Sequence, residues 1–456
     1  RTCFCISWNH ASPLPAIIVF GMGNNRIVGL DLVKGIAIFM MIIVHAVTQV
    51  IADYDGSIFL SIIDKIPKIV LYCVIYPLAL VGLWGTTFTV VTSITTTLSI
   101  LRILDTNKRA FGSYLFQRWL FLVFLRLAES TIDSFLNQQY DVFMNSRIVI
   151  PPIVIAGPAT TLDAIGWGGL IAPIVASIVH PIMKNKWKTI MVFFFFIFSL
   201  FAISPFVESW FAYLSKASYS HGFGLCGDIF GKVAFGRFKI AQTSAFAVAG
   251  ALFGYLIYKR SSISFQIFVS FILFVSCVAT FVVWSVVDSS YFDHIADENV
   301  PLPAQIFSLG CECFFIYIHI YFVDGDRDIT KRLRSRRRCT YLFRLGMLSL
   351  TVFCIGSWVG RKLALPWKLV FGPPCTHDPP SLNWNAWVCI AFTLFVLFVW
   401  LGAAFLWEKV DFRFSLEHIL SWLMAKLAGK TYTPNTRRFV YGPAEELAKG
   451  RKRVRS

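Results

Sequence analysis

The 456-residue chain is 56% apolar and 16% aromatic, and only 15% of its residues are charged. A soluble domain carries about 25% charged and about 45–50% apolar residues. The composition therefore excludes a soluble enzyme, a disordered chain and a disulfide-rich secreted module, and it is typical of a chain that lies mostly in lipid. The net charge of +17 is spread between apolar runs, which favours membrane lipids over nucleic acid as its partner.

The elements are expected in the following order. Residues 1–25 form an N-terminal extension, either mobile or a targeting segment, with an apolar stretch too short for a convincing signal peptide. A membrane-spanning helix then needs about 20 mainly apolar residues. Ten runs qualify: 28–51, 69–101, 113–131, 162–180, 189–208, 241–258, 263–285, 303–323, 341–360 and 386–407. The sequence predicts an all-α, polytopic integral membrane protein, a bundle of about ten transmembrane helices within residues 26–408.

The placement of Lys and Arg predicts the orientation of these spans. With the N-terminus inside and the spans alternating, the inner segments hold 28 basic residues and the outer loops hold 10. Because cytoplasmic loops are enriched in Lys and Arg, this favours a multi-pass protein with both termini cytoplasmic. The loop 324–340 contains seven basic residues. They are interpreted as holding this loop at the inner leaflet, whose lipids are anionic.

Residues 409–456 follow the last span and are predicted as an amphipathic helix and a basic cytoplasmic tail. Within 412–430 the apolar residues recur at helical spacing on one face. A helix lying in the inner interface and a helix packed on the bundle both account for this pattern. The apolar face consists of Leu416, Ile419, Leu420, Leu423 and Leu427.

The first span carries the ionisable residues that are most informative about chemistry. Lys34 and His45 are eleven residues apart, which places both on one helix face about 16 Å apart along the axis. Asp31 lies three residues before Lys34 and is expected to pair with it. With an unperturbed pKa of about 6.5, His45 suits a general base. A hydrogen bond from His45 to a neighbouring helix is the purely structural alternative.

The sequence around these residues also resembles the motif of a known protein superfamily. The segment LDLVKGIAIFMMIIVH, residues 30–45, resembles the first helix of the membrane acyltransferase superfamily, which includes the acyltransferase-3 proteins and the relatives of heparan-α-glucosaminide N-acetyltransferase. That helix reads L-D-x-x-R-G-x-A-I, with ten residues between the basic residue and a His. Lys34 stands where Arg is commoner, and Lys does not form the bidentate fork of Arg.

Weaker matches follow in the order expected for this superfamily. Arg118 in the third predicted span stands where the family has basic residues, which implies a role in cofactor binding. The segment TTLDAIGWGGL resembles its D-x-L-x-x-I-G motif, although Thr160 replaces the acid and Asp163 lies three residues later. Glu312 and His319 share one face of the eighth predicted span, as a second polar patch lining a cavity or as core packing. Near the C-terminus, GPAEEL (residues 442–447) resembles a G-P-x-E-W-L ending.

The resemblance implies a transmembrane acyltransferase domain over residues 26–408. It implies transfer of an acyl group, with acetyl favoured, from acyl-CoA to a hydroxyl or amine of a glycan or lipid-linked acceptor across the membrane. His45, Lys34 and Asp31 would be the catalytic residues, with Lys34 and Arg118 at the acyl-CoA and His319, Glu312 and Asp163 near the cavity. No zinc spacing or phosphate loop occurs, so no metal is predicted.

Other functions and partners stay open at this stage. The chain could be a non-catalytic acyltransferase-like subunit of a membrane complex, or a transporter or flippase that uses its intramembrane charges for coupling. A homodimer and a larger membrane complex are both compatible with the sequence. Fold analogy alone does not decide between these classes.

Overall fold

The structure is a computed structural model that describes residues 27–53, 58, 85–145, 159–236, 238–287, 300–324, 336–377, 380–427, 431–432 and 440–441. Within these ranges the chain is almost entirely helical, and the strands form one hairpin, β1 (Cys375–His377) and β2 (Pro380–Leu382), paired antiparallel. Eight helices of the described residues are long and apolar enough to cross a membrane, or nine if a bent pair counts as one span. The chain is thus an all-α protein with the helices of a multi-pass membrane protein.

Most of these helices begin and end near the predicted bounds. The eight are α1 with its π-helical extension η1 (Val28–His45 and Ala46–Ile51), α5 (Thr86–Thr106), α7 (Thr161–Val179), α8 (Lys186–Ser220), α10 (Ile240–Tyr258), α11 (Ile263–Val287), α12 (Leu302–Asp324) and α16 (Ala386–Lys409). Polar side chains cap the first free amides of three of them, α7, α8 and α16. Asn185 and Asn385 accept from the N–H groups of Lys188 and Val388.

Other helices depart from the predicted pattern. The ninth predicted span is broken into α14 (Thr340–Gly346) and α15 (Ser349–Phe371), which meet at 85°. Helix α6 (Phe111–Asn145) contains the predicted span 113–131 but runs beyond it. The predicted outer loop 209–240 is largely helical, because α8 continues to Ser220 and α9 (Gly224–Ala234) follows. Residues 69–84 of the second predicted span lie outside the described residues, so the count of ten stays a prediction.

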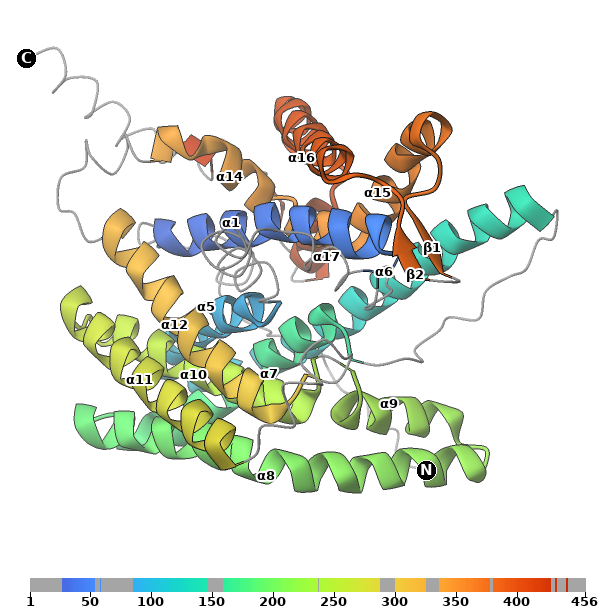
Figure 1. The fold of residues 1–456 in the computed structure, drawn as a ribbon. Helices are drawn as coiled ribbons and strands as arrows, with labels where there is room; N and C mark the ends of the chain where they lie inside the picture. Colours follow the sequence, from blue (N-terminus) through green and yellow to red (C-terminus); the bar gives the residue numbers. More distant parts are fainter. Residues whose placement is uncertain are drawn as a thin grey trace, which may run out of the picture.

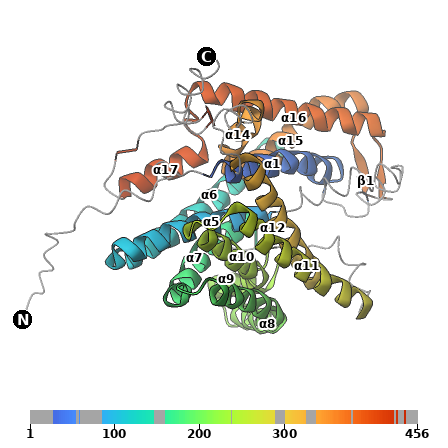
Figure 2. The same cartoon turned by 90° about the vertical axis from the view of Figure 1, so that its left-hand side faces the viewer.

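Helix α1 lies between two packing units (Figures 1 and 2). The larger core joins α5, α7, α8, α10, α11 and α12, and includes the fully buried Phe193, Phe246, Phe253 and Tyr317. The second core joins α1 and η1 to α15 and α16, with Phe392 and Trp400 buried in it. One face of α1 therefore meets each unit.

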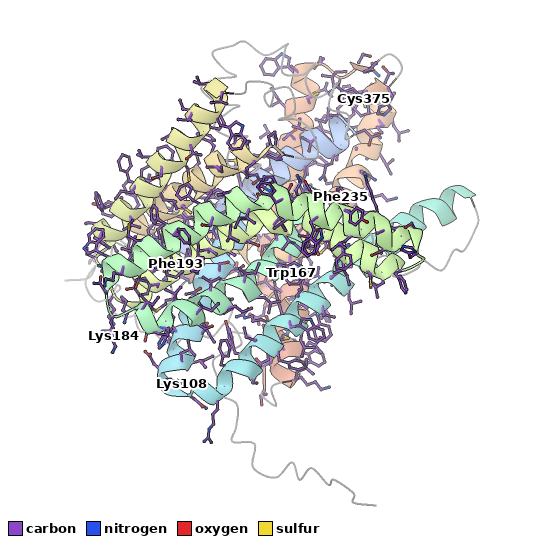
Figure 3. All side chains as sticks on the ribbon, turned by 90° about the horizontal axis from the view of Figure 1, so that it is seen from below. Lys108, Trp167, Lys184, Phe193, Phe235 and Cys375 are labelled. Atoms are coloured by element: carbon purple, nitrogen blue, oxygen red, sulfur yellow. The ribbon has the colours of Figure 1, made fainter. Side chains whose placement is uncertain are left out.

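Contacts between helix ends agree with the predicted alternation of the spans. His180 lies 3.4 Å from Asp105, at the ends of α7 and α5, which were predicted to face the same side. His377 lies 3.5 Å from Asp53, and both belong to predicted outer loops. Figure 3 shows Lys108 and Lys184 at one edge of the molecule and Cys375 at the opposite edge. We call the Lys108 edge the basic end. Its assignment to the cytoplasm stays a prediction.

The N-terminus of α1 is fixed by α12. The Asp324 carboxylate accepts hydrogen bonds from the N–H groups of Val28, at 3.2 Å, and Gly29, at 2.7 Å. A carboxylate at this position satisfies free amides and opposes the helix dipole. Gly29 also allows close approach, because a Cβ there would lie 2.6 Å from the Ile320 Cα. The start of α1 is therefore held tightly against the end of α12.

The amphipathic segment forms α17 (Leu416–Leu427), as the spacing of its apolar residues predicts. It contacts α15 and α6. Leu420, Met424 and Ala425 are buried, while Ile419 and Leu427 of the predicted apolar face remain exposed. The helix thus packs on the bundle through part of its apolar face. The N-terminal extension and the tail from residue 442 lie outside the described residues.

Candidate functional site

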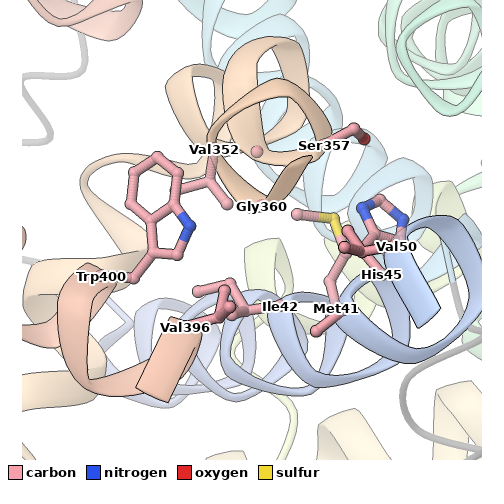
Figure 4. A pocket seen from close by; sticks show the side chains of 11 residues that line it. Met41, Ile42, His45, Val50, Val352, Ser357, Gly360, Val396 and Trp400 are labelled. Carbon is pink, nitrogen blue, oxygen red and sulfur yellow. The ribbon is translucent and has the colours of Figure 1, made fainter. Parts of the chain in front are cut away.

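A pocket opens where α1 meets α15 and α16, and His45 lies on its wall (Figure 4). The pocket is small and partly open, with a cavity volume of about 10 Å³, which is room for about one water molecule. Apart from His45 and the Ser357 side chain, its lining is apolar. The lining residues are Met41, Ile42, His45, Ala46, Val50, Val352, Gly356, Ser357, Gly360, Val396 and Trp400.

The backbone changes conformation directly after His45. Residues Val28–His45 form a regular α-helix, and Ala46–Ile51 form a π-helix. π-Helical turns are rare and occur frequently at functional sites. The Thr48 hydroxyl donates to the Val44 carbonyl, and the Ser357 hydroxyl donates to the Gln49 side chain. The latter bond ties the π-helical turn to α15 beside the pocket.

Asp31 and Lys34 lie at the other end of α1, beside α14. A Cβ on Gly35 would overlap the Leu342 carbonyl, so Gly35 permits the close contact between α1 and α14. Gly346 of α14 also lies close to α1, because a Cβ on Gly346 would be 3.3 Å from the Asp31 carbonyl oxygen. Since α1 is regular from Val28 to His45, the predicted separation of Lys34 and His45 along the axis, about 16 Å, holds. Both side chains are half-buried.

The C-terminal segment is attached to this same region. Arg344 of α14 donates to Glu408 at 2.7 Å and to the Tyr441 hydroxyl at 3.0 Å. The buried Arg336 donates to the Val440 carbonyl at 3.1 Å. The segment that leads into GPAEEL is therefore held next to α14. The motif residues Gly442, Pro443, Glu445 and Leu447 lie outside the described residues.

The remaining predicted site residues lie away from the His45 pocket. Arg118 donates to the Tyr114 hydroxyl at 3.1 Å, and Tyr114 donates to the Thr96 carbonyl of α5. The His319 Nδ1 lies 2.8 Å from the Phe315 carbonyl of its own helix. Neither residue lines the pocket. A role for Arg118 in binding acyl-CoA stays a prediction.

Asp163 belongs to a polar network at the start of α7. Thr160 and Asp163 form a capping box, in which each side chain accepts from the backbone N–H of the other residue. The Asp163 carboxylate also lies 2.9 Å from the Lys232 Nζ and 3.6 Å from Arg126, which pairs with Glu129 at 2.6 Å. The pairing of Arg126 with Glu129 agrees with the spacing of these residues. The network accounts for the burial of the Asp163 carboxylate, and its place near a cavity stays a prediction.

Lys232 was not foreseen as a functional or structural residue. It lies in the predicted outer loop 209–240, where a Lys is expected to be solvated, but in α9 it is 6% exposed. Only the extra helix α9 carries it to Asp163. Its position in an apolar segment, IFGKVAF, was the available signal.

Glu312 of α12 is fully buried. Within the described residues its hydrogen-bond partners are hydroxyl groups only. The Thr86 and Ser308 hydroxyls both donate to its Oε1 atom. The Oε2 atom has no hydrogen-bond partner there. His319 bonds to its own backbone, and Glu312 bonds to Thr86 and Ser308; a shared polar patch of Glu312 and His319 stays a prediction.

The comparisons with known proteins add no relatives: no family model, no curated protein and no solved structure matches the chain. The candidate function therefore depends on the geometry described above and on the resemblance of the first helix.

Proposed function

We propose that the chain is a membrane-embedded acyltransferase that moves an acyl group from acyl-CoA to a hydroxyl or amine. The observation that carries this proposal is the pocket at His45, which combines one imidazole with apolar walls at a π-helical turn. Apolar walls match the chemistry of an acyl group, but the cavity has room for about one water molecule, so the walls would have to move apart to admit the acyl group. The first-helix resemblance points to the same chemistry.

In the proposed reaction His45 acts as the general base. It accepts the proton of the acceptor hydroxyl or amine as the oxygen or nitrogen attacks the thioester carbonyl carbon. The carbon–sulfur bond then breaks, and the CoA thiolate leaves and takes the proton from the imidazole. No further reactant is needed, because the proton lost by the acceptor ends on the CoA thiol. The π-helical turn would set the direction of the imidazole.

The donor would approach from the basic end. Arg337 and Arg338 are exposed, and guanidinium groups bind phosphates well. Under this proposal they and Lys34 would attract the anionic donor. The axial distance of Lys34 from His45, about 16 Å, suits the extended pantetheine arm of CoA. Under this proposal the basic end is cytoplasmic and the acceptor meets His45 from the far side.

The test is CoA release by the purified full chain from acetyl-CoA in the presence of a broad glycan mixture. Removing a general base lowers the rate by about 10²–10⁴-fold, so His45→Gln and His45→Ala should lose activity to that extent. His180→Ala, a change at the end of α7 outside the pocket, is the matched control and should keep it. Folding of each variant is checked by its melting temperature.

The alternatives give different results in the same assay. A well-folded wild-type protein that binds no acyl-CoA would contradict the proposal and favour a structural subunit. Turnover that persists in His45→Gln would retain the acyltransferase but remove His45 as its base.

A further inference from the structure

The most unusual buried group outside the His45 pocket is the Glu312 carboxyl. Glu312 has no exposed surface and lies near the middle of α12, a helix of membrane-spanning length. An uncompensated carboxylate in this environment is very costly, and ionisable residues within spans generally have a partner. Among the described residues, however, no Lys, Arg or His forms an ion pair with it, and its hydrogen-bond donors are the hydroxyls of Thr86 and Ser308.

Four oxygen-bearing side chains converge at this position. The Thr86 and Ser308 hydroxyls approach the Oε1 atom, and the Thr87 hydroxyl also lies beside the carboxyl. The Thr87 hydroxyl is near enough to the Glu312 carboxyl to interact with it, but neither the Thr87 Oγ1 nor the Glu312 Oε2 atom makes a hydrogen bond of standard geometry within the described residues. Buried polar atoms are nearly always satisfied. The arrangement therefore lacks one positively charged or hydrogen-bonding component.

An ionised Glu312 would need one positive charge beside it. Thr86 is the first residue of α5, so the positive end of that helix dipole already offsets part of one negative charge. A single carboxylate with neutral oxygen ligands suits a hard monovalent cation, whereas a divalent ion usually takes more than one carboxylate.

The other charged and titratable groups on the packed helices are few. Cys311 and Cys313 flank Glu312, and α11 contributes Cys277. Helix α12 itself also carries Tyr317, His319 and Asp324. Helix α1 carries Asp31, Lys34 and His45, and α5 has Arg102 and Asp105 near its far end. Helix α10 has no Asp, Glu, Lys, Arg or His over its length.

We infer that Glu312, with the hydroxyls of Thr86, Thr87 and Ser308, forms a binding site for one monovalent cation, a proton or Na⁺. A hydroxyl-rich stripe continues from the site along α5, within the larger core. Its side chains are buried, and the hydroxyls of Thr89 and Thr97 also lack partners within the described residues. The stripe consists of Thr86, Thr87, Thr89, Ser93, Thr96 and Thr97. This site is independent of acyl transfer at His45.

The test measures the melting temperature of the full chain in detergent. Sodium is varied against choline at constant ionic strength, and pH is varied from 5 to 9 without sodium. A Na⁺ site predicts a wild-type melting temperature that rises with the logarithm of the sodium concentration, by linkage. A proton site predicts no sodium effect and a fall with rising pH, since the bound proton is lost. In either case Glu312→Gln should abolish the response, while Glu208→Gln, which removes the partner of Lys239, should keep it.

A second measurement on the wild type guards against a variant that does not fold. A hydrophobic carbodiimide reacts with protonated carboxyls in apolar surroundings, and labelling of Glu312 can be followed by mass spectrometry. Labelling that slows with sodium supports a Na⁺ site, and labelling that slows only with rising pH supports a proton site. If sodium and pH leave this labelling unchanged, or if wild type and Glu312→Gln melt identically under all conditions, the inference is wrong.

Discussion

Glu417 and Thr351 cap each other's helices. The Thr351 hydroxyl donates to the Glu417 Oε2 atom at 2.7 Å, and the Leu350 and Thr351 N–H groups donate to Oε1. In return, the Thr351 Oγ1 atom accepts from the Leu416 N–H at 3.0 Å, at the start of α17. The first turn of α15 thus takes its cap from another helix. This relationship fixes α17 against the helix that forms one wall of the His45 pocket.

Removing the Glu417 side chain should therefore loosen two helix starts at once. We expect Glu417→Ala to lower the free energy of unfolding by about 1–2 kcal/mol, the usual cost of losing a cap. Glu417→Gln keeps an oxygen acceptor and should cost less. Melting temperatures of the two variants in detergent measure the difference. Equal losses for Ala and Gln would mean that the negative charge, and not the acceptor, supplies the stability.

The same carboxyl should make the stability depend on pH. Burial raises the pKa of Glu417 above 4.5, against hydrogen bonds that lower it. The folded state therefore favours the protonated form, and its contribution to stability is full below pH 4.5 and is lost as the pH rises through the raised pKa. Acidification from pH 7 should thus strengthen the attachment of α17. The neighbouring His418 has a lowered pKa, mainly through burial and also through Arg413, and has the opposite effect.

The Glu417 contribution can be separated from that of His418 by difference. Glu417→Gln keeps His418 but has no titrating carboxyl at position 417. The difference in melting temperature between wild type and Glu417→Gln should therefore shift in favour of the wild type as the pH falls from 7 to 5. A difference that is constant over this range would contradict the raised pKa of Glu417.

Asp324 should control both the stability of α1 and the activity proposed for His45. We expect Asp324→Ala to cost about 0.5–2 kcal/mol, because the Val28 and Gly29 amides lose their acceptor. Asp324→Asn keeps an acceptor but loses the charge that opposes the helix dipole, so its loss should be smaller. Melting temperature and CoA release are measured on both variants. A stability loss without any change in activity would show that the start of α1 does not position His45.

The buried contact of Asp163 with Lys232 should be the most sensitive polar contact in the α7–α9 region. Removing one partner of a buried ion pair typically costs about 3–5 kcal/mol. We expect Lys232→Met to approach the low end of that range, because Arg126 still lies 3.6 Å from Asp163. A double-mutant cycle with Asp163→Asn, read from unfolding, should give a coupling of about 1 kcal/mol or more. Additive single-variant losses would contradict this coupling.

The sequence predicted the helices that are apolar along their whole length, because lipid exposure and burial both require apolar side chains. The pairing of Arg126 with Glu129, three residues later in one helix, follows from helical spacing alone. The sequence did not predict the 85° break after Gly346, since the apolar run 341–360 continues through it. Nor could it place Asp163, whose partner Lys232 lies 69 residues later in the chain. Contacts of that kind depend on tertiary packing and leave no local pattern.

In the candidate site, too, local spacing was predictable from the sequence and tertiary contacts were not. The spacing of Lys34 and His45 on one helix followed from the sequence. The π-helix after His45 and the Ser357 bond to Gln49 did not, because they depend on how α15 packs. Glu312 was recognised as a buried polar residue, but its partners on α5 were not foreseen, since Thr is common in ordinary spans.

The position of α1 between the two units has a consequence for biosynthesis. Helix α1 is made early, whereas α12, α14, α15 and α16, against which it packs, follow some 250 residues or more later. The larger core, by contrast, needs no residue beyond α12. The nascent chain would assemble that core first and hold α1 without most of its neighbours until translation is almost complete. A ribosome that stopped before α16 would leave a membrane-inserted bundle with an intact larger core and no pocket at His45.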